Sequence, residues 1–316
     1  MRVVISGSAY LDIDAYACCI AYAELLNHQG IAARAVSSAP LNASISTSVL
    51  GWDARLNGYQ PVAGDEFVLV DVCDPDHFDP IVRLENVREV IDHHPGFEHY
   101  WSQRLGTAAD IQPIGAAATL VFQRWETAGL LSHISPHSAA LLATAILDNT
   151  LNFTGQMTTP HDIRAYEVLA RCANLSAEWP QRYFGECQAA IEADLTGALS
   201  ADMKQMTATP NLPQRIAQMT VWDAGALIHR HRAAINQWLA AQGEDWLLNA
   251  ICLRECKSYW LTGSLLSRQK LSRLLDVEWQ GSLAVLERGM QRKELLKLAL
   301  AAPDESVSAP GKAACY

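Results

Sequence analysis

The stretch "REVIDHHPGFEH", residues 88–99, places an acid and two adjacent histidines directly after the apolar pair Val90–Ile91. A buried strand favours apolar side chains. Three titratable groups at its end therefore cost desolvation free energy unless solvent, a proton-transfer network or a metal compensates them. Asp92-His93-His94 alone fits an ordinary polar turn as well as it fits a functional site. The choice between these interpretations depends on the partners that the rest of the chain supplies.

Short apolar runs alternate with helical patterns through the first half of the chain. This alternation is typical of a parallel sheet covered by helices. We therefore expect an α/β fold with a doubly wound parallel sheet, whose ligand-binding loops lie at the carboxyl ends of the strands. The predicted strands are 3–6, 32–37, 67–71 and 88–92, and the predicted helices are 12–30, 115–130, 135–150, 159–173 and 176–195.

The pattern changes after about residue 195. Strands are predicted at 214–223, 245–254 and 258–264, and helices near 224–241, 267–275 and 291–300. We expect two domains with a cleft between them, the first over 1–195 and a second, smaller α/β domain over 196–302. Residues 303–316 are rich in Pro, Ser, Ala and Gly and are predicted to form a loose tail.

Composition restricts the class of protein. Half of the 316 residues are apolar, enough for a sizeable core, and no apolar run is long enough to span a membrane. The start, "MRVVISGSAY", lacks the apolar stretch of a secretory signal, so a cytoplasmic location is expected. Residues 1–199 hold 10 Lys and Arg against 23 Asp and Glu, whereas residues 200–316 hold 14 against 11. This asymmetry suggests that the first part binds cations and the second part an anion.

Titratable side chains follow several of the apolar runs. We expect them to converge, because the carboxyl ends of parallel strands lie along one edge of the sheet. Like charges brought so close repel strongly unless a divalent cation lies among them, and carboxylates with imidazole suit an ion such as Mn²⁺. One such aspartate is more often a helix cap, but the whole set is hard to explain by caps. The residues concerned are Asp12, Asp14, Asp71, Asp92, His93, His94 and Asp148.

These motifs resemble those of a known superfamily. "DID" (12–14), "LVD" (69–71), "VIDHH" (90–94) and "ILDNTLNF" (146–153) resemble, in that order, the four motifs of the DHH phosphoesterase superfamily. "ERGMQRKELL" (287–296) resembles the Ser-Arg-Lys-Lys motif of its second-domain subgroup, the family II (manganese-dependent) inorganic pyrophosphatases and the exopolyphosphatases. "PIGAAATLVFQRW" (113–125) is similar to the pyrophosphatase segment that follows the DHH motif. The resemblance covers nearly the whole chain.

The resemblance implies a catalytic site with two ions, Mn²⁺ or else Mg²⁺ or Co²⁺. One ion would be bound by Asp12, Asp71 and Asp148, and the other by Asp14, Asp71, His93 and Asp148. His94 would face the substrate phosphate, and Arg292, Lys293 and Lys204 of the second domain would bind phosphate oxygens. The implied reaction is hydrolysis of a phosphoanhydride (pyrophosphate or a polyphosphate) or a phosphoester by activated water. On composition alone, Arg292 and Lys293 fit a solvated helix start equally well, and Lys204 fits an ordinary solvated surface lysine better than a phosphate ligand.

The chain departs from the pyrophosphatase pattern at several positions. Ser8 stands where the first motif has a metal-binding histidine, and Val72-Cys73 replace a His-Asn pair. Gln291 and Glu294 replace the Ser and the final Lys of the C-terminal motif. Loss of a cation and gain of an anion weaken binding of a highly charged substrate. Longer polyphosphates, nucleotides and less charged phosphoesters therefore stay open as substrates. A non-catalytic or regulatory homologue that binds phosphate or nucleotide stays open as well.

The expected partner is a small phosphorylated substrate, with no membrane. The weakly basic second part and the lack of a basic stripe disfavour nucleic acid, except a short oligonucleotide cleaved by a phosphodiesterase activity. Dimerisation is frequent in the pyrophosphatases that the chain resembles, so a homodimer also stays open.

Overall fold

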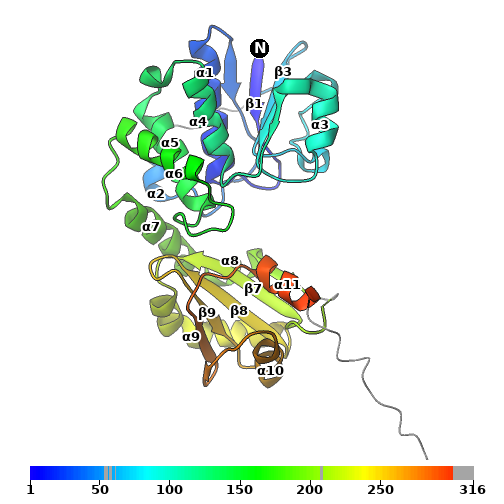
Figure 1. Ribbon diagram of the computed structural model, residues 1–316, viewed down its shortest axis with the longest axis vertical. Helices are drawn as coiled ribbons and strands as arrows, with labels where there is room; N and C mark the ends of the chain where they lie inside the picture. Colours follow the sequence, from blue (N-terminus) through cyan, green and yellow to red (C-terminus); the bar gives the residue numbers. More distant parts are fainter. Residues whose placement is uncertain (53–55, 57–58, 61, 207–208, 302–316) are drawn as a thin grey trace, which may run out of the picture. The chain divides into compact units, whose positions relative to one another are not determined.

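The computed structural model describes residues 1–52, 56, 59–60, 62–206 and 209–301 (Figure 1). The chain forms two compact units, a first unit of Met1–Ile191 and a second unit of Glu192–Tyr316. The predicted tail over 303–316 lies outside the described residues. Among the residues that the structure describes, none of the helices has the length and apolar composition that crossing a bilayer requires.

The first unit contains a five-stranded parallel sheet in the order β2-β1-β3-β4-β5. Its strands are β1 (Arg2–Ile5), β2 (Ala33–Ala35), β3 (Glu66–Val70), β4 (Val87–Asp92) and β5 (Ala109–Ile111). This arrangement confirms the predicted doubly wound α/β fold. The first four strands match the predicted ones, whereas β5 was not predicted because it has only three residues, none of them fully buried.

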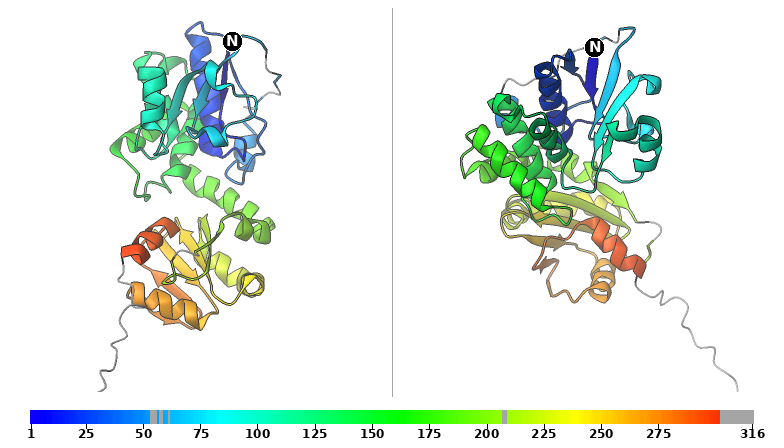
Figure 2. Two further views of the ribbon diagram at one scale, coloured as in Figure 1. Left: turned by 90° about the vertical axis from the view of Figure 1, so that its right-hand side faces the viewer. Right: turned by 45° about the horizontal axis from the view of Figure 1, so that its top comes forward.

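Helices cover both faces of this sheet. Helices α1 and α4 lie against one face and α3 against the other (Figures 1 and 2), while α5 packs on α1 and α6 packs on α5. The helices are α1 (Ile13–His28), α2 (Thr47–Leu50), α3 (Glu98–Leu105), α4 (Ala117–Thr127), α5 (Pro136–Asn149), α6 (Pro160–Cys172) and α7 (Trp179–Ala193). Short 3-10 turns occupy Pro75–His77, Leu84–Asn86, Gly106–Ala108 and Leu131–His133.

The apolar strands are buried on both faces, which explains why they read as continuous apolar runs rather than alternating ones. Alternate residues such as Ile5 and Leu69 pack with Trp101 of α3, whose side chain is fully buried. Trp101 also donates a hydrogen bond from Nε1 to Cys73 O at 2.7 Å. Helix α1 ends at His28 with Gln29 as its C-cap, and Gly30 follows in the left-handed conformation (φ 78°) that is typical of a helix end.

The strand order creates a switch point between β1 and β3. The chain leaves β1 through α1 towards β2 on one side, and then returns to build β3 on the other side of β1. In doubly wound sheets, ligands bind outside the carboxyl ends of the two strands that flank such a point. The residues after β1 and after β3 are therefore the first place to look for a functional site.

The second unit is a smaller α/β unit, as predicted. Its six-stranded sheet has the order β10-β11-β9-β8-β7-β6, in which β7 and β8 are parallel and the other neighbours antiparallel. Helices α10 and α11 pack on one face, and α9 lies on the other (Figure 2). The strands are β6 (Met203–Gln205), β7 (Arg215–Val221), β8 (Trp246–Cys252), β9 (Lys257–Leu261), β10 (Trp279–Gln280) and β11 (Leu283–Leu286). The helices are α8 (Leu195–Ala201), α9 (Ala224–Gln242), α10 (Leu265–Leu274) and α11 (Arg292–Ala301).

Candidate metal centre

The first two aspartates lie where β1 gives way to α1. Asp12 is the N-cap of α1, and its Oδ1 accepts a hydrogen bond from Ala15 N at 3.0 Å. This is the role expected of a lone aspartate at such a position, but it uses only one of the two carboxylate oxygens. Asp14 lies in the first turn and is fully buried. Its two oxygens accept hydrogen bonds of 2.8 Å each from Ala117 N and Ala118 N.

Asp71 is the first residue after β3, on the other side of the switch point. Its backbone has a φ of 55°, a conformation that costs a residue other than glycine about 1–3 kcal/mol and that is concentrated at functional sites. Among the described residues, no group donates a hydrogen bond to its buried Oδ1. A buried carboxylate oxygen without a partner is unfavourable, and a bound cation would satisfy it.

His93 has the nitrogen arrangement of a metal ligand. Its Nδ1 lies 3.0 Å from Ile114 O, so Nδ1 carries the proton and donates it to this carbonyl. In the neutral ring the lone pair is then on Nε2, which lies 3.4 Å from Asp71 Oδ1 and 3.9 Å from Asp14 Oδ2. Ligating histidines usually have their second nitrogen fixed in this way by a carbonyl or carboxylate. One potential ligand atom each of Asp71, His93 and His94 lies within 4.8 Å of the others.

Asp92 orients the histidine pair. Its Oδ1 accepts hydrogen bonds from His93 N (2.7 Å) and His94 N (3.2 Å), and lies 2.9 Å from His94 Nδ1. This contact raises the pKa of the His94 imidazole. Burial acts to raise the pKa of Asp92, but the interactions with His94 outweigh burial and lower it. The His94 side chain is 57% exposed, so it stays accessible to a ligand.

Asp148 reaches this region from a helix. It is the penultimate residue of α5, within the helix predicted over 135–150. Its Oδ1 lies 2.9 Å from the hydroxyl of Tyr183 on α7, and this hydroxyl also lies 2.9 Å from Ser44 O. Burial raises the pKa of Asp148 to about 7, with Asp12 and Asp14 adding to the effect and Tyr183 opposing it. Burial and Asp148 also raise the pKa of Tyr183, which keeps the phenol protonated as a donor.

The acids come from separate segments of the chain and influence each other's ionisation. Burial raises the pKa of Asp71 well above its usual value, and the charges of Asp14 and Asp12 raise it further. Burial also raises the pKa of Asp14, although His93 opposes this. Burial acts to lower the pKa of His93, but Asp71 and Asp14 outweigh it and raise the pKa to about 10. Buried carboxyl groups that ionise this reluctantly are stabilised in their charged forms by a nearby cation.

The three predicted phosphate-binding cations all belong to the second unit. Lys204 lies on the edge strand β6, and Lys293 is exposed in the first turn of α11. Arg292 is bound within its own unit, because its guanidinium contacts Asp202 Oδ1 (2.5 Å), Asp202 O (2.7 Å) and Ile216 O (3.2 Å). The contact of these three side chains with phosphate stays a prediction.

The departures from the pyrophosphatase pattern have structural roles. Val72 and Cys73 are buried in the hydrophobic cluster that includes Trp101, so apolar packing replaces the polar pair at this place. Glu294 accepts hydrogen bonds from Gln291 N (3.1 Å) and from Arg288 Nη1 (2.8 Å), which fixes the start of α11. Ser8 is held through its backbone, since Ser8 N donates to His77 O at 3.0 Å.

The roles of two participants were not predicted. Asp92 is among the residues expected to converge, but it orients the histidines instead, a role that its position beside them could have suggested. Tyr183 lies 35 residues beyond Asp148 on a different helix, and no spacing in the sequence points to it.

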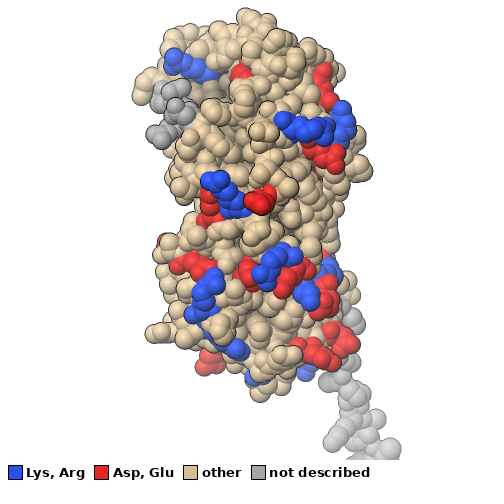
Figure 3. Space-filling view, turned by 90° about the vertical axis from the view of Figure 1, so that its left-hand side faces the viewer, with Lys and Arg blue, Asp and Glu red and all other residues tan. Residues whose placement is uncertain are grey.

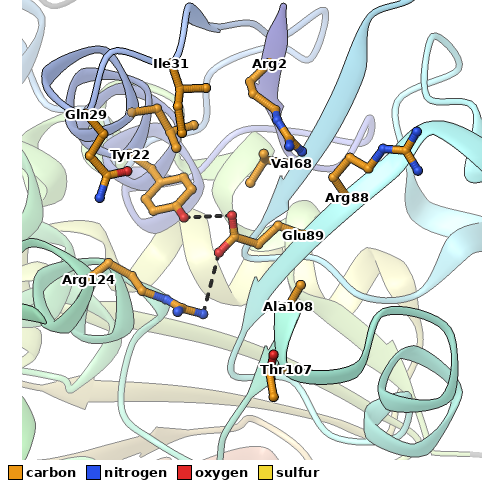
Figure 4. A pocket seen from close by; sticks show the side chains of 11 residues that line it. Arg2, Tyr22, Gln29, Ile31, Val68, Arg88, Glu89, Thr107, Ala108 and Arg124 are labelled. Carbon is orange, nitrogen blue, oxygen red and sulfur yellow. Dashed lines mark hydrogen bonds and ion pairs between the residues drawn. The ribbon is translucent and has the colours of Figure 1, made fainter. Parts of the chain in front are cut away.

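A cavity of about 380 Å³ in the first unit is lined by three arginines, Arg2, Arg88 and Arg124 (Figure 4). It lies at the amino-terminal ends of β1 and β4, the opposite edge of the sheet from Asp71. Glu89 accepts a hydrogen bond from Tyr22 Oη (2.7 Å) and lies 3.6 Å from Arg124 Nη2. Arg2 and Arg88 both pair with Glu66, at 3.2 and 2.7 Å. Arg124 Nη2 also lies 3.1 Å from Asp110 Oδ2, so three acidic side chains offset the three arginines and the cavity offers little to a phosphate group.

Comparison with known proteins is consistent with this geometry. The model of the DHH family, N-terminal domain, matches residues 2–146. A relative from Bacillus pumilus, named as a manganese-dependent inorganic pyrophosphatase, is 28% identical over 255 residues, which cover 77% of this chain and 80% of the relative. A protein of the same name from Exiguobacterium is 27% identical over 260 residues, covering 79% of this chain and 81% of that protein.

Two solved structures share the fold. The crystal structure of a Methanococcus jannaschii protein described as a family II inorganic pyrophosphatase has a TM-score of 0.61 at 19% identity. The match covers 95% of this chain and all of that one. An exopolyphosphatase-related protein from Bacteroides fragilis has a TM-score of 0.52 at 14% identity, covering 94% of this chain and 89% of that one.

Proposed function

We propose that the protein is a metal-dependent phosphohydrolase. The model of the DHH family, N-terminal domain, matches residues 2–146, and the chain is homologous to manganese-dependent inorganic pyrophosphatases. Its substrate is a phosphoanhydride such as pyrophosphate or a polyphosphate, or a phosphoester. The observation that carries the proposal is the group formed by Asp14, Asp71 and His93 at the switch point, with a buried Asp71 oxygen that accepts no hydrogen bond from any described residue.

We propose two Mn²⁺ ions as the cofactor, with Mg²⁺ or Co²⁺ as substitutes. Asp12, Asp71 and Asp148 bind one ion, and Asp14, Asp71, His93 and Asp148 bind the other. When bound, such ions lower the pKa of a water nucleophile and stabilise the charge on the attacking and leaving oxygens. The names of the relatives support manganese, and carboxylate with imidazole is a donor set that suits it.

His94 has the properties of a substrate-facing group. Asp92 occupies its Nδ1, so Nε2 is the nitrogen left to donate to a phosphoryl oxygen. The raised pKa of His94 favours the imidazolium form, which has the charge that binds a phosphate and stabilises its transition state. Asp92 acts through His94 and is a positioning residue.

The second unit supplies the remaining cations in this proposal. Lys204, Arg292 and Lys293 bind phosphate oxygens, with Arg292 exchanging part of its contact with Asp202 for the substrate. Because Glu294 adds a negative charge to the same helix start, a substrate less charged than pyrophosphate is favoured over pyrophosphate itself. Nucleoside monophosphates and dinucleotides, which carry a smaller total charge, belong to this group.

The face of the molecule in Figure 3 is poorly suited to a long nucleic acid. On the face of the molecule in Figure 3, the lysines and arginines of the described residues are interspersed with acidic side chains and form no continuous stripe. A nucleic-acid interface normally requires such a stripe along the backbone path. This supports a small phosphorylated molecule as the substrate.

The departures at Ser8 and Glu294 favour a second candidate, a protein that binds phosphate or nucleotide without hydrolysing it. A serine hydroxyl is a poorer ligand than imidazole, so one of the two ions would bind weakly. Two-ion chemistry would then be slow or lost, while binding through the remaining groups would persist.

A hydrolysis screen separates the two candidates. The full chain is incubated with Mn²⁺ and pyrophosphate, tripolyphosphate, long polyphosphate, nucleotides, dinucleotides or short oligonucleotides, and phosphate or nucleotide release is measured. We expect Mn²⁺-dependent turnover of at least one substrate, abolished in Asp71→Asn and retained in His99→Ala, an exposed histidine of α3. Binding of these compounds without turnover would favour the second candidate.

A further inference from the structure

One short segment contacts two of the proposed metal ligands at once. In the segment Ile114–Thr119, Ile114 O accepts the hydrogen bond from His93 Nδ1 (3.0 Å). Three and four residues later, Ala117 N and Ala118 N donate to the two oxygens of Asp14 (2.8 Å each). The placement of this backbone therefore determines where His93 and Asp14 lie relative to each other.

The same segment is held by a carboxylate that has no part in metal binding. Asp162, the third residue of α6, is fully buried. Its Oδ2 accepts a hydrogen bond from Gly115 N (3.2 Å), and its Oδ1 accepts one from Thr119 Oγ1 (2.6 Å). Thr159 N and Thr159 Oγ1 also donate to Oδ2, at 2.7 and 2.8 Å. With four donors satisfied, this carboxylate is fully used within the protein.

The packing around Gly115 shows how closely Asp162 approaches the segment. A Cβ atom at position 115 would lie 2.7 Å from Asp162 Oδ2 and 2.7 Å from Thr150 Cγ2. Non-bonded atoms do not approach this closely, so glycine is required there. Any shift of Asp162 thus transmits to the backbone at Gly115, next to the carbonyl that fixes His93.

We propose that Asp162 is a positioning residue for metal binding. It fixes the segment Ile114–Thr119, and through it the orientation of His93 and Asp14. The inference rests on the proposed function insofar as it takes His93 and Asp14 to be ligands. The two bonds to Thr159 cap helix α6 and need no further role. The bonds to Gly115 and Thr119 are not explained by capping.

The test compares Mn²⁺ binding by metal-free variants of the full chain, using calorimetric titration at a temperature where circular dichroism shows each variant folded. Asp162→Ala removes all four contacts and should bind Mn²⁺ about 10–100-fold more weakly, the usual effect of losing a group that orients a ligand. Asp162→Asn should stay within a few-fold of wild type. Its amide oxygen can accept from Gly115 and Thr159, and its NH₂ can donate to Thr119 Oγ1.

The matched control is Thr159→Ala, which removes the capping hydroxyl of α6 but leaves Asp162 bound to Gly115 and Thr119. It should lower the melting temperature without changing Mn²⁺ affinity. If Asp162→Ala does not fold, Thr119→Val removes one positioning contact and should weaken Mn²⁺ binding several-fold.

The proposal is overturned if Asp162→Ala binds Mn²⁺ as wild type does, or if Thr159→Ala weakens binding equally. Unchanged affinity in Thr119→Val, used in its place, would also overturn it. Because the readout is metal affinity, the outcome is independent of turnover. A wild-type protein that binds Mn²⁺ but hydrolyses nothing would refute the proposed activity and leave this inference intact.

Discussion

His93 Nε2 lies 3.4 Å from Asp71 Oδ1, and neither atom has a better partner among the described residues. This separation is longer than an ordinary hydrogen bond between nitrogen and oxygen. It is close to the roughly 3–3.5 Å expected between two ligand atoms that each lie about 2.0–2.2 Å from one transition-metal ion. The pair therefore has the spacing of two ligands of the same cation, contributed by adjacent parallel strands.

Loss of the Asp71 carboxylate or of the His93 imidazole should greatly weaken metal binding at the site that they share. We expect Asp71→Asn and His93→Ala to lower Mn²⁺ affinity by more than about 100-fold, because losing a group that merely orients a ligand already costs about 10–100-fold. The measurement is calorimetric titration of metal-free protein. His99→Ala serves as the control, since this exposed histidine lies on α3. Unchanged affinity in either ligand variant would remove that residue from the proposed set.

Tyr183→Phe tests the hydroxyl that contacts Asp148. The substitution removes one hydrogen bond to a carboxylate that is proposed to contact both ions, and keeps the buried ring. We expect Mn²⁺ affinity to fall about 10-fold, at the lower end of the range for such partners. Tyr166→Phe is a matched control. Tyr166 lies on α6, its ring packs near Phe153, and the substitution likewise removes only a phenol hydroxyl. Equal effects of the two substitutions would show that Tyr183 has no special role.

The metal-free protein should lose stability as the pH rises from 6 to 8. The pKa of Asp148, raised by burial to about 7, means that the folded state holds a proton more tightly than the unfolded chain does. Its contribution to stability is complete below the unfolded pKa, about 4, and is lost as the pH rises through about 7. Burial acts to lower the pKa of His93, but Asp71 raises it to about 10. The contribution of His93 to stability is therefore complete below its unfolded pKa, about 6.5, and is lost as the pH rises through about 10.

Mn²⁺ should reverse this trend, because metal ligands bind in their deprotonated forms. The increase in melting temperature on adding Mn²⁺ should therefore be larger at pH 8 than at pH 6, by several degrees. Thermal unfolding with Mn²⁺ or EDTA at both pH values measures the difference. An increment that does not depend on pH would argue against Asp148 and His93 as ligands.

Most of the first unit could be predicted because β1, β3 and β4 are largely buried and contain nearly unbroken apolar runs. The convergence of Asp14, Asp71 and His93 followed from parallel-sheet geometry alone. Some short or half-buried elements, such as β5 and α3, escaped prediction. Helix α3 buries only Trp101 among its eight residues, so it shows little helical periodicity. The roles of Tyr183 and Asp162 depend on tertiary contacts over 35 and more residues, which no local pattern encodes.

Arg292→Ala separates a structural role from substrate binding. The side chain is 15% exposed and makes three contacts with Asp202 and Ile216, so its removal should lower the free energy of unfolding by about 1–3 kcal/mol. If Arg292 also binds phosphate, the substitution should raise KM for the substrate identified in the screen. Lys297→Ala, at an exposed position of the same helix, is the control for general loss of charge. A destabilised variant with unchanged KM would assign Arg292 to the fold alone.

Anomalous X-ray scattering at the manganese edge, from crystals of the full chain grown with Mn²⁺, locates the ions themselves. We expect a peak between the carboxylates of Asp71 and Asp148 with His93 Nε2 among its ligands, and a second peak on the Asp12 side. Crystals that hold Mn²⁺ elsewhere but show no peak beside Asp71 would mean that these acids do not gather around a cation, and the proposed chemistry would fail with them.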